Sequence, residues 1–160
     1  MIRIEKVKEI LDRAQEYADK TSQCKKVSVG AIIVPHNTKI EIYGANICYP
    51  MNCKTDGCRR IALYGEDSKN HRLPSDCRSL HSEIDAITQA AKFGVAIRDA
   101  SMFVTRYPCE ACARAIVNAG IREVYYGREQ EISEETERIF SSNHVMVYHI
   151  DTWNYTDTRR

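Results

Sequence analysis

Residues 100–127, ASMFVTRYPCEACARAIVNAGIREVYYG, decide the fold of this chain. The first six residues and the last seven are apolar, β-branched or aromatic runs of the kind that form strands. Between them, residues 108–120 predict a helix that begins near Pro108 and ends at Gly120. A strand, a helix and a second strand in this order indicate a right-handed crossover between parallel strands. The stretch therefore predicts an α/β protein.

The flanking sequence extends this unit in both directions. It predicts helices over residues 2–20, 81–94 and 131–142, and strands over residues 27–35, 39–46 and 144–150. The first two of these strands read as a hairpin, and the last three strands of the chain read as parallel. We predict a three-layer α/β/α sandwich around a mixed five-stranded sheet.

Residues 47–80 show neither the 3.6-residue period of an amphipathic helix nor the two-residue alternation of a strand. They carry four cysteines, two prolines and scattered glycines, and they predict an ordered but irregular insertion that something must hold in place. At 160 residues the chain has the size of one ordinary domain, so we predict a single domain over residues 1–160 that contains this insertion.

Composition excludes several classes of function. No run approaches the roughly 20 apolar residues that a membrane span needs, and residues 1–20 are charged throughout, so we predict a cytoplasmic protein without a membrane partner. The formal net charge of +1 makes nucleic acid an unlikely partner. Seven cysteines in such a chain are more often metal ligands or catalytic groups than disulfides.

Cys109 and Cys112 form a C-x-x-C motif on the first turn of the predicted helix over residues 108–120. Two thiolates at this spacing can bind one zinc ion, and the alternative is a redox dithiol. His81 opens the preceding helix, and both helix starts lie at the same edge of the predicted sheet. Three protein ligands leave a tetrahedral zinc with one open position, which is typical of catalysis.

Glu83 stands two residues after His81, which is a rotation of roughly 200° on a helix. It is therefore poorly placed to be a further ligand. We predict instead that it lies beside the open position and acts as the general acid and base. The alternative is that Glu83 only stabilises the helix N-terminus, as acids in a first turn do.

His81-Ser82-Glu83 and Pro108-Cys109-Glu110-Ala111-Cys112 resemble the H-x-E and P-C-x-x-C signature of zinc-dependent nucleoside and nucleotide deaminases. The resemblance implies the cytidine deaminase-like fold, a catalytic Zn²⁺ bound by His81, Cys109 and Cys112, and Glu83 as the proton shuttle. It implies that Asn46 contacts the sugar of the substrate. Ser82 replaces the usual alanine and keeps a backbone N–H for the base.

Within this family the insertion and the stretch CRSLHSEIDAI resemble deoxycytidylate deaminases most closely. The implied reaction is conversion of dCMP to dUMP and ammonia, with a small-molecule nucleotide as substrate and a homo-oligomer, a hexamer or smaller, as the assembly. We predict that Arg78 and Arg106 contact the phosphate, because planar guanidinium groups suit it. The alternatives are an RNA-editing deaminase and a zinc-stabilised nucleotide-binding module without turnover.

The remaining cysteines suggest a second metal site. By the same resemblance, a structural zinc takes Cys24, His71 and Cys77, with either Cys53 or Cys58 as the fourth ligand. A closed four-ligand site would supply the free energy that holds the insertion. The alternative is that these cysteines are reduced and partly buried small apolar residues.

Overall fold

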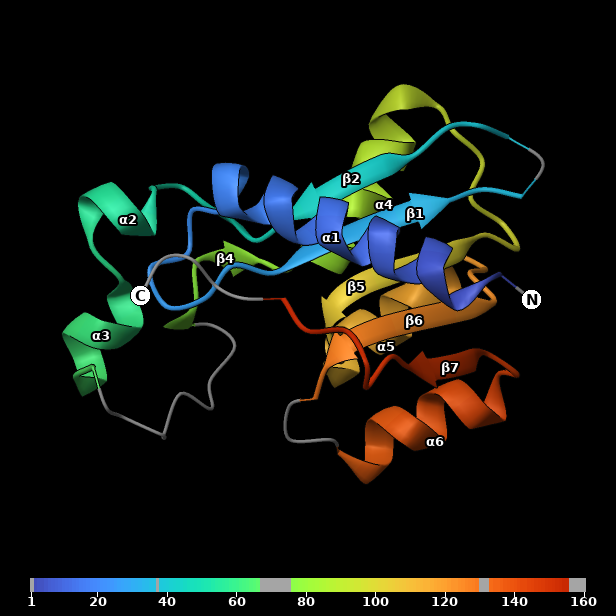
Figure 1. The fold of residues 1–160 in the computed structure, drawn as a ribbon. Helices are drawn as coiled ribbons and strands as arrows, with labels where there is room; N and C mark the ends of the chain where they lie inside the picture. Colours follow the sequence, from blue (N-terminus) through green and yellow to red (C-terminus); the bar gives the residue numbers. More distant parts are fainter. Residues whose placement is uncertain (1, 37, 67–75, 130–132, 156–160) are drawn as a thin grey trace.

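The computed structural model describes residues 2–36, 38–66, 76–129 and 133–155, and it contains a sheet of five strands flanked by helices (Figure 1). The elements are α1 (Ile4–Thr21), β1 (Gly30–Val34), β2 (Ile42–Ala45), β3 (Ile47–Cys48), α2 (Cys53–Asp56), α3 (Arg59–Tyr64), β4 (Ser79–Leu80), α4 (Ser82–Phe93), β5 (Ser101–Arg106), α5 (Glu110–Asn118), β6 (Glu123–Arg128), α6 (Glu134–Ser142) and β7 (Met146–His149).

The five-stranded sheet has the order β2-β1-β5-β6-β7. β1 runs antiparallel to both β2 and β5, whereas β5, β6 and β7 are parallel to one another. The predicted mixed sheet, its hairpin and its three parallel strands are therefore confirmed. Because β1 alone is reversed, its start lies at the same edge as the ends of β2 and β5.

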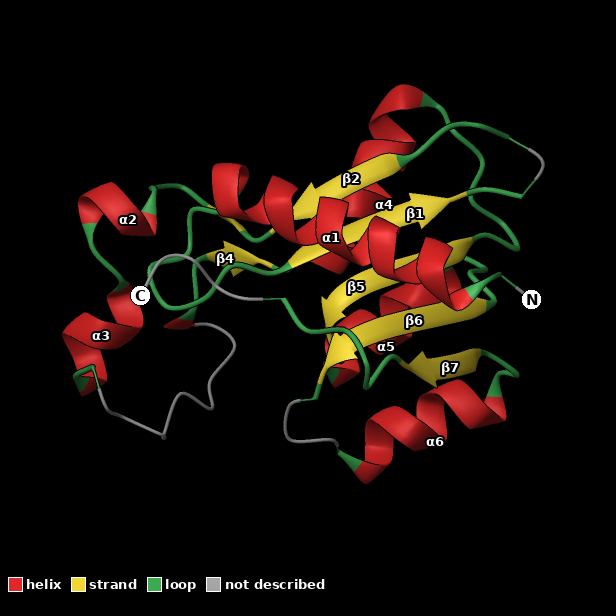
Figure 2. Cartoon of the chain, in the orientation of Figure 1, coloured by secondary structure: helices red, strands yellow, loops and turns green. Residues whose placement is uncertain are grey.

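The sheet has helices on both faces (Figure 2), and alternating residues of its strands build two separate cores, one on each face. Ile32, Phe103 and Tyr125 face α1 and pack with Leu11. On the opposite face, residues one position further along these strands pack against α4, α5 and α6; they are Ile33, Val104 and Tyr126. This two-residue period gives the predicted three layers, with α1 on one side and three helices on the other.

α4 and α5 both begin at the edge of the sheet where β5 ends. His81 and Cys109 are their N-cap residues, so both side chains lie at a helix start. α4 ends at Gly94, which is left-handed with φ 67°, as the sequence predicts. Pro108 precedes the N-cap of α5 and does not occupy its first turn, because the helix begins two residues later than expected.

The insertion is more regular than predicted. Its ends pair as the two short strands β3 and β4, in which Ile47 lies opposite Leu80 and Cys48 opposite Ser79. Two short helices, α2 and α3, follow in the insertion, and the Asn52 side chain caps α2 by accepting a hydrogen bond from the backbone N–H of Lys54. Helices of four and six residues are too short to leave a periodic pattern in a sequence.

Among the described residues, no helix combines the length and the apolar character that a bilayer crossing requires.

Candidate functional site

Three side chains from two helix starts converge at the edge where β5 ends. His81 Nδ1 lies 3.5 Å from the Cys109 sulfur and 3.4 Å from the Cys112 sulfur. The three ligand atoms all lie within 4.8 Å of one another, and this is the only such group of three found in the described part of the chain. One imidazole nitrogen and two sulfurs are the donors that zinc prefers. These side chains therefore fit a zinc ion.

The ionisation of the three groups shows how strongly they interact. A hydrogen bond from Cys112, together with one from His81, lowers the pKa of Cys109 to about 3 despite the cost of burial. Because Cys112 shares its proton with Cys109, the pKa of Cys112 is raised. The hydrogen bond to Cys109 also raises the pKa of His81. Sharing of protons around a thiolate prepares the group for a cation that displaces those protons.

Glu83 lies beside this group and not within it. Its side chain is 4% exposed, and burial raises the pKa of its carboxyl group above the usual value. The carboxyl group accepts a hydrogen bond at Oε2 from the Ser82 hydroxyl at 3.0 Å, and it lies close enough to Cys112 to raise the pKa of that thiol. The arrangement places a carboxyl group within reach of one ligand without making it a ligand.

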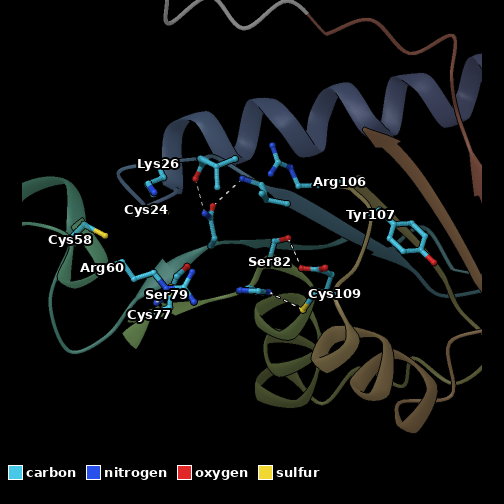
Figure 3. A pocket seen from close by; sticks show the side chains of 15 residues that line it. Cys24, Lys26, Cys58, Arg60, Cys77, Ser79, Ser82, Arg106, Tyr107 and Cys109 are labelled. Carbon is cyan, nitrogen blue, oxygen red and sulfur yellow. Dashed lines mark hydrogen bonds between the residues drawn. The ribbon is translucent and has the colours of Figure 1, made fainter. Parts of the chain in front are cut away.

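The site opens into a cavity of about 210 Å³ (Figure 3). His81, Ser82, Glu83 and Cys109 line it. The insertion contributes further lining residues, and these are Cys58, Arg60, Cys77 and Ser79. The cavity is therefore shared between the core fold and the insertion.

Asn46 lies in the cavity wall at the end of β2 and is buried. Its Oδ1 accepts a hydrogen bond from the backbone N–H of Val29 at 3.0 Å, and its Nδ2 donates to the carbonyl of Val27 at 2.7 Å. The amide thus holds the entry to β1 in place. One hydrogen on Nδ2 is left for a ligand in the cavity.

Positive charge lines the cavity on several sides. Lys26, Arg60 and Arg106 belong to its wall, and Arg60 is close enough to His81 to affect the ionisation of that ring. The Nε of Arg106 is buried and has no hydrogen-bond partner within the described ranges. Burial, followed by the charge of Arg128, lowers the pKa of Arg106. Arg78, predicted to contact the phosphate, is not among the residues that line the cavity.

The predicted second metal site is less compact. Cys24, Cys58 and Cys77 line the cavity, whereas Cys53 is buried beside Cys48. Burial, a hydrogen bond with Cys48 and the charges of Cys58 and Cys24 raise the pKa of Cys53 to about 12. These cysteines do not form a group as tight as that of His81 within the described ranges. The predicted ligand His71 lies outside those ranges.

Sequence reasoning missed Lys26 and Tyr107, which also line the cavity, and it left Cys48 unassigned. Pairing between β1 and β2 places Gly30 opposite Ala45. In this antiparallel pair, the residues before Gly30 leave the sheet at the same edge as Asn46. The register of the predicted hairpin could therefore have indicated that Lys26 lies near Asn46. Tyr107 carried a weaker signal, its position directly after a strand end.

The chain resembles known deaminases over most of its length. The family model of the MafB19-like deaminases matches residues 5–156. The ComE operon protein 2 of Bacillus subtilis is 33% identical over 131 residues, which are 81% of this chain and 64% of that protein. The deoxycytidylate deaminase of Mus musculus is 36% identical over 126 residues, which are 77% of this chain and 63% of that protein. The chain thus spans less than two thirds of either relative.

A solved structure shows the same fold. The dCMP deaminase of the cyanophage S-TIM5, in complex with dCMP and dUMP, superposes with a TM-score of 0.70 and 25% identity, covering 94% of this chain and all of that one. The predicted cytidine deaminase-like fold and the predicted family resemblance are confirmed. Because the family model spans nearly the whole sequence and the solved structure shares its architecture, this chain belongs to the MafB19-like deaminase family.

Proposed function

We propose that this protein hydrolyses the exocyclic amine of a cytosine nucleotide, converting dCMP and water to dUMP and ammonia. The observation that carries the proposal is the juxtaposition of two groups at one end of a cavity. His81, Cys109 and Cys112 bring their ligand atoms within 4.8 Å of one another, and the buried Glu83 carboxyl group lies close enough to affect the ionisation of His81 and Cys112. The relatives named deoxycytidylate deaminase and the cyanophage enzyme support the choice of substrate.

The proposed catalytic metal is zinc, held by His81, Cys109 and Cys112. When bound, zinc lowers the pKa of a coordinated water to about 7 and so supplies a nucleophile at neutral pH. The exposed side of His81 faces the cavity, whereas Cys112 is buried behind it. A substrate base therefore has access to the group from the cavity.

Glu83 is the proposed proton shuttle. Its buried carboxyl group takes one proton from the attacking water and delivers it to N3 of the base. It then passes the second proton, from the new C4 hydroxyl group, to the amino group, so that the C4–N bond breaks, ammonia leaves and C4 becomes a carbonyl. Burial raises the pKa of this carboxyl group. The raised pKa suits a proton shuttle, because a shuttle must both accept and release a proton near neutral pH. The Ser82 hydroxyl donates a hydrogen bond at 3.0 Å to the carboxyl group, beside the proposed metal ligands.

The cavity wall supplies contacts for the rest of a nucleotide. Arg106 offers a buried guanidinium whose Nε has no hydrogen-bond partner in the described part of the chain, which suits a phosphate oxygen. Lys26 and Arg60 add positive charge around the same cavity. The remaining hydrogen on Asn46 Nδ2 is the proposed contact to the sugar, and the backbone N–H of Ser82 is the proposed contact to the base.

Four further parts belong to the proposal. By the resemblance, a structural zinc is bound by Cys24, Cys77, His71 and one of Cys53 or Cys58, and the protein assembles as a symmetric homo-oligomer. By its composition and length, it acts in the cytoplasm and forms one domain over residues 1–160. The closeness of Cys24 and Cys58 to Cys53 supports the metal site.

The test is ammonia release from dCMP, CMP, deoxycytidine, dCTP and adenosine nucleotides, with zinc per chain determined on the same sample. We expect turnover of dCMP above that of the other compounds. Glu83→Gln should lower kcat by at least a factor of about 100, because general acid and base catalysis contributes that much, while zinc stays bound. The matched control is Glu5→Gln, which removes an exposed first-turn acid from α1, the helix on the other face of the sheet.

Two results would contradict the proposal. Wild-type kcat in Glu83→Gln would remove the role of this carboxyl group, and it would favour the simpler reading in which Glu83 only stabilises the start of α4. Lack of turnover across the panel, in protein that holds zinc, would favour an RNA substrate or a binding module without turnover.

A further inference from the structure

The hydroxyl group of Ser82 is turned toward the Glu83 carboxylate and not toward the cavity alone. Ser82 Oγ donates to Glu83 Oε2 at 3.0 Å, and both side chains are buried, at 0% and 4% exposed. Neighbouring side chains on a helix do not normally face each other. A contact between consecutive residues therefore reflects the special geometry of a first turn, where α4 begins at Ser82.

Among the described residues, Ser82 is the one side chain that donates a hydrogen bond to the Glu83 carboxylate. The backbone N–H of Glu83 is a further donor to it. Cys112 cannot take this place in the zinc-bound protein, because a thiolate ligand has no proton to donate. The partner atom of the Ser82 hydroxyl is Oε2, which leaves Oε1 for proton transfer.

The backbone of Ser82 packs directly against Gly44 in β2. A Cβ atom at Gly44 would lie 2.2 Å from the Ser82 carbonyl oxygen, so the strand and the first turn of α4 are in direct contact. The side chain of Ser82 has no freedom to leave this place, because it is fully buried. The hydroxyl group is thus a rigid donor at a defined position.

We propose that Ser82 is a positioning residue for the deamination reaction, and that its hydroxyl group orients Glu83 so that Oε1 can carry the proton between water and base. The inference rests on the proposed function of the site. A hydrogen bond to a charged group contributes enough to select one orientation of a carboxylate. Ser82 itself does not exchange a proton with the substrate.

The experiment compares Ser82→Ala, Ser82→Thr and the wild type by steady-state kinetics, using the compound with the highest turnover in the substrate panel. Ser82→Ala should lower kcat on the order of tenfold and leave KM unchanged, because the lost contact is to Glu83 and not to the substrate. Bound zinc should be the same as in the wild type. Ser82→Thr keeps a hydroxyl group and should recover most of kcat.

The chain offers a matched control at the far end of the sheet. Ser101, at the start of β5, is also buried and donates to a carboxylate, Glu123 Oε2, at 2.6 Å. Ser101→Ala removes the same kind of hydrogen bond and should leave kcat unchanged. An equal loss of kcat in Ser101→Ala and Ser82→Ala would show a general effect of destabilisation and would overturn the proposal.

Two further outcomes would overturn it. Wild-type kcat in Ser82→Ala would show that the hydroxyl group has no role, and a raised KM with unchanged kcat would show a substrate contact. Both differ from failure of the proposed function, which would appear as inactivity of the zinc-loaded wild-type protein toward every compound in the panel. Inactive wild type would leave Glu83 without a reaction to serve, and so would also reject the role of Ser82.

Discussion

At the scale of single residues, Gly44 sets how closely α4 approaches the sheet. A Cβ atom there would lie 2.2 Å from the Ser82 carbonyl oxygen and 2.5 Å from the backbone nitrogen of Ala86. Both neighbours are backbone atoms, which cannot turn away as a flexible side chain would. The first turn of α4, which carries Glu83, therefore rests directly on β2.

Gly44→Ala should push the first turn of α4 away from the sheet. We expect the free energy of unfolding to fall by about 2–3 kcal/mol, as in other overpacked sites, and kcat to fall at least tenfold because Glu83 is displaced. The control is Gly30→Ala, where the Cβ atom would lie 1.9 Å from the Ala14 carbonyl oxygen in α1, on the other face. Urea unfolding measures the stability of both variants, and steady-state kinetics measures their kcat. Equal kcat in Gly44→Ala and Gly30→Ala would contradict the displacement of Glu83.

Arg106 illustrates a second effect at this scale, because a buried and incompletely paired guanidinium is costly unless a ligand uses it. Arg106→Met should lower kcat/KM for dCMP by about 10- to 100-fold, the range for hydrogen bonds to a charged group, and leave deoxycytidine unaffected. Stability should not fall, since burial disfavours the charge. The control is the exposed Arg122→Met, and an equal loss with deoxycytidine would exclude a phosphate contact.

The sequence points to the residues of the candidate site more directly than to the residues that support them. His81, Glu83, Cys109 and Cys112 are recognisable because the proposed chemistry requires these residue types at short spacings along two helices. The supports depend on residues far apart in the chain. The tie between Asn46 and Val29 and the contact of Gly44 with α4 follow from strand register and helix docking, which local patterns do not contain.

At the scale of elements, the insertion is the part that the sequence described least well. Its helices are short, and α3 has no buried residue, so neither propensity nor burial defines it. The helices and strands that were predicted correctly each carry a core-facing stripe or alternation, as α1 does with Val7, Leu11 and Ala14. Elements that bury apolar side chains leave a pattern, and elements held by other means do not.

The cysteines around Cys53 are the proposed means of holding the insertion. If they bind zinc, the wild type should contain two zinc ions per chain, and Cys77→Ser, which removes a ligand whichever of Cys53 and Cys58 is the fourth, should retain one and lower Tm by roughly 10 °C. Cys109→Ser provides the contrast, because it should lose the other ion. One zinc ion per wild-type chain, with unchanged Tm in Cys77→Ser, would instead identify these cysteines as small buried apolar residues.

At the scale of the whole molecule, the segment after β7 joins the two ends of the described chain. The Trp153 ring is buried with α1 and donates from Nε1 to Asp12 Oδ1 at 2.8 Å. It also covers Gly127 so closely that a Cβ atom there would lie 2.0 Å from the ring. The guanidinium of Arg128 lies 5.3 Å from the centre of the same ring. The last part of the described chain is thus a component of the core beside α1.

Trp153→Ala should lower the free energy of unfolding by about 3–5 kcal/mol, as expected for loss of a large buried ring. Trp153→Phe keeps most of the apolar contact, loses the hydrogen bond to Asp12 and should cost about 1 kcal/mol. Urea unfolding followed by far-UV circular dichroism measures both, since this is the one tryptophan of the sequence and fluorescence would be lost. Equal losses in the two variants would show that the hydrogen bond, and not the ring, carries the effect.

The short ladder between β3 and β4 has a consequence for how such a protein can change its specificity. Because Ile47 lies opposite Leu80, the chain leaves the core fold and returns to it at adjacent points. Replacing everything between these strands by a tight hairpin turn would not move Asn46 or His81, the residues on either side. The segment between β3 and β4 can therefore be exchanged as a unit. Its replacement would change the part of the cavity wall that contains Arg60 and leave the residues of the candidate site in place.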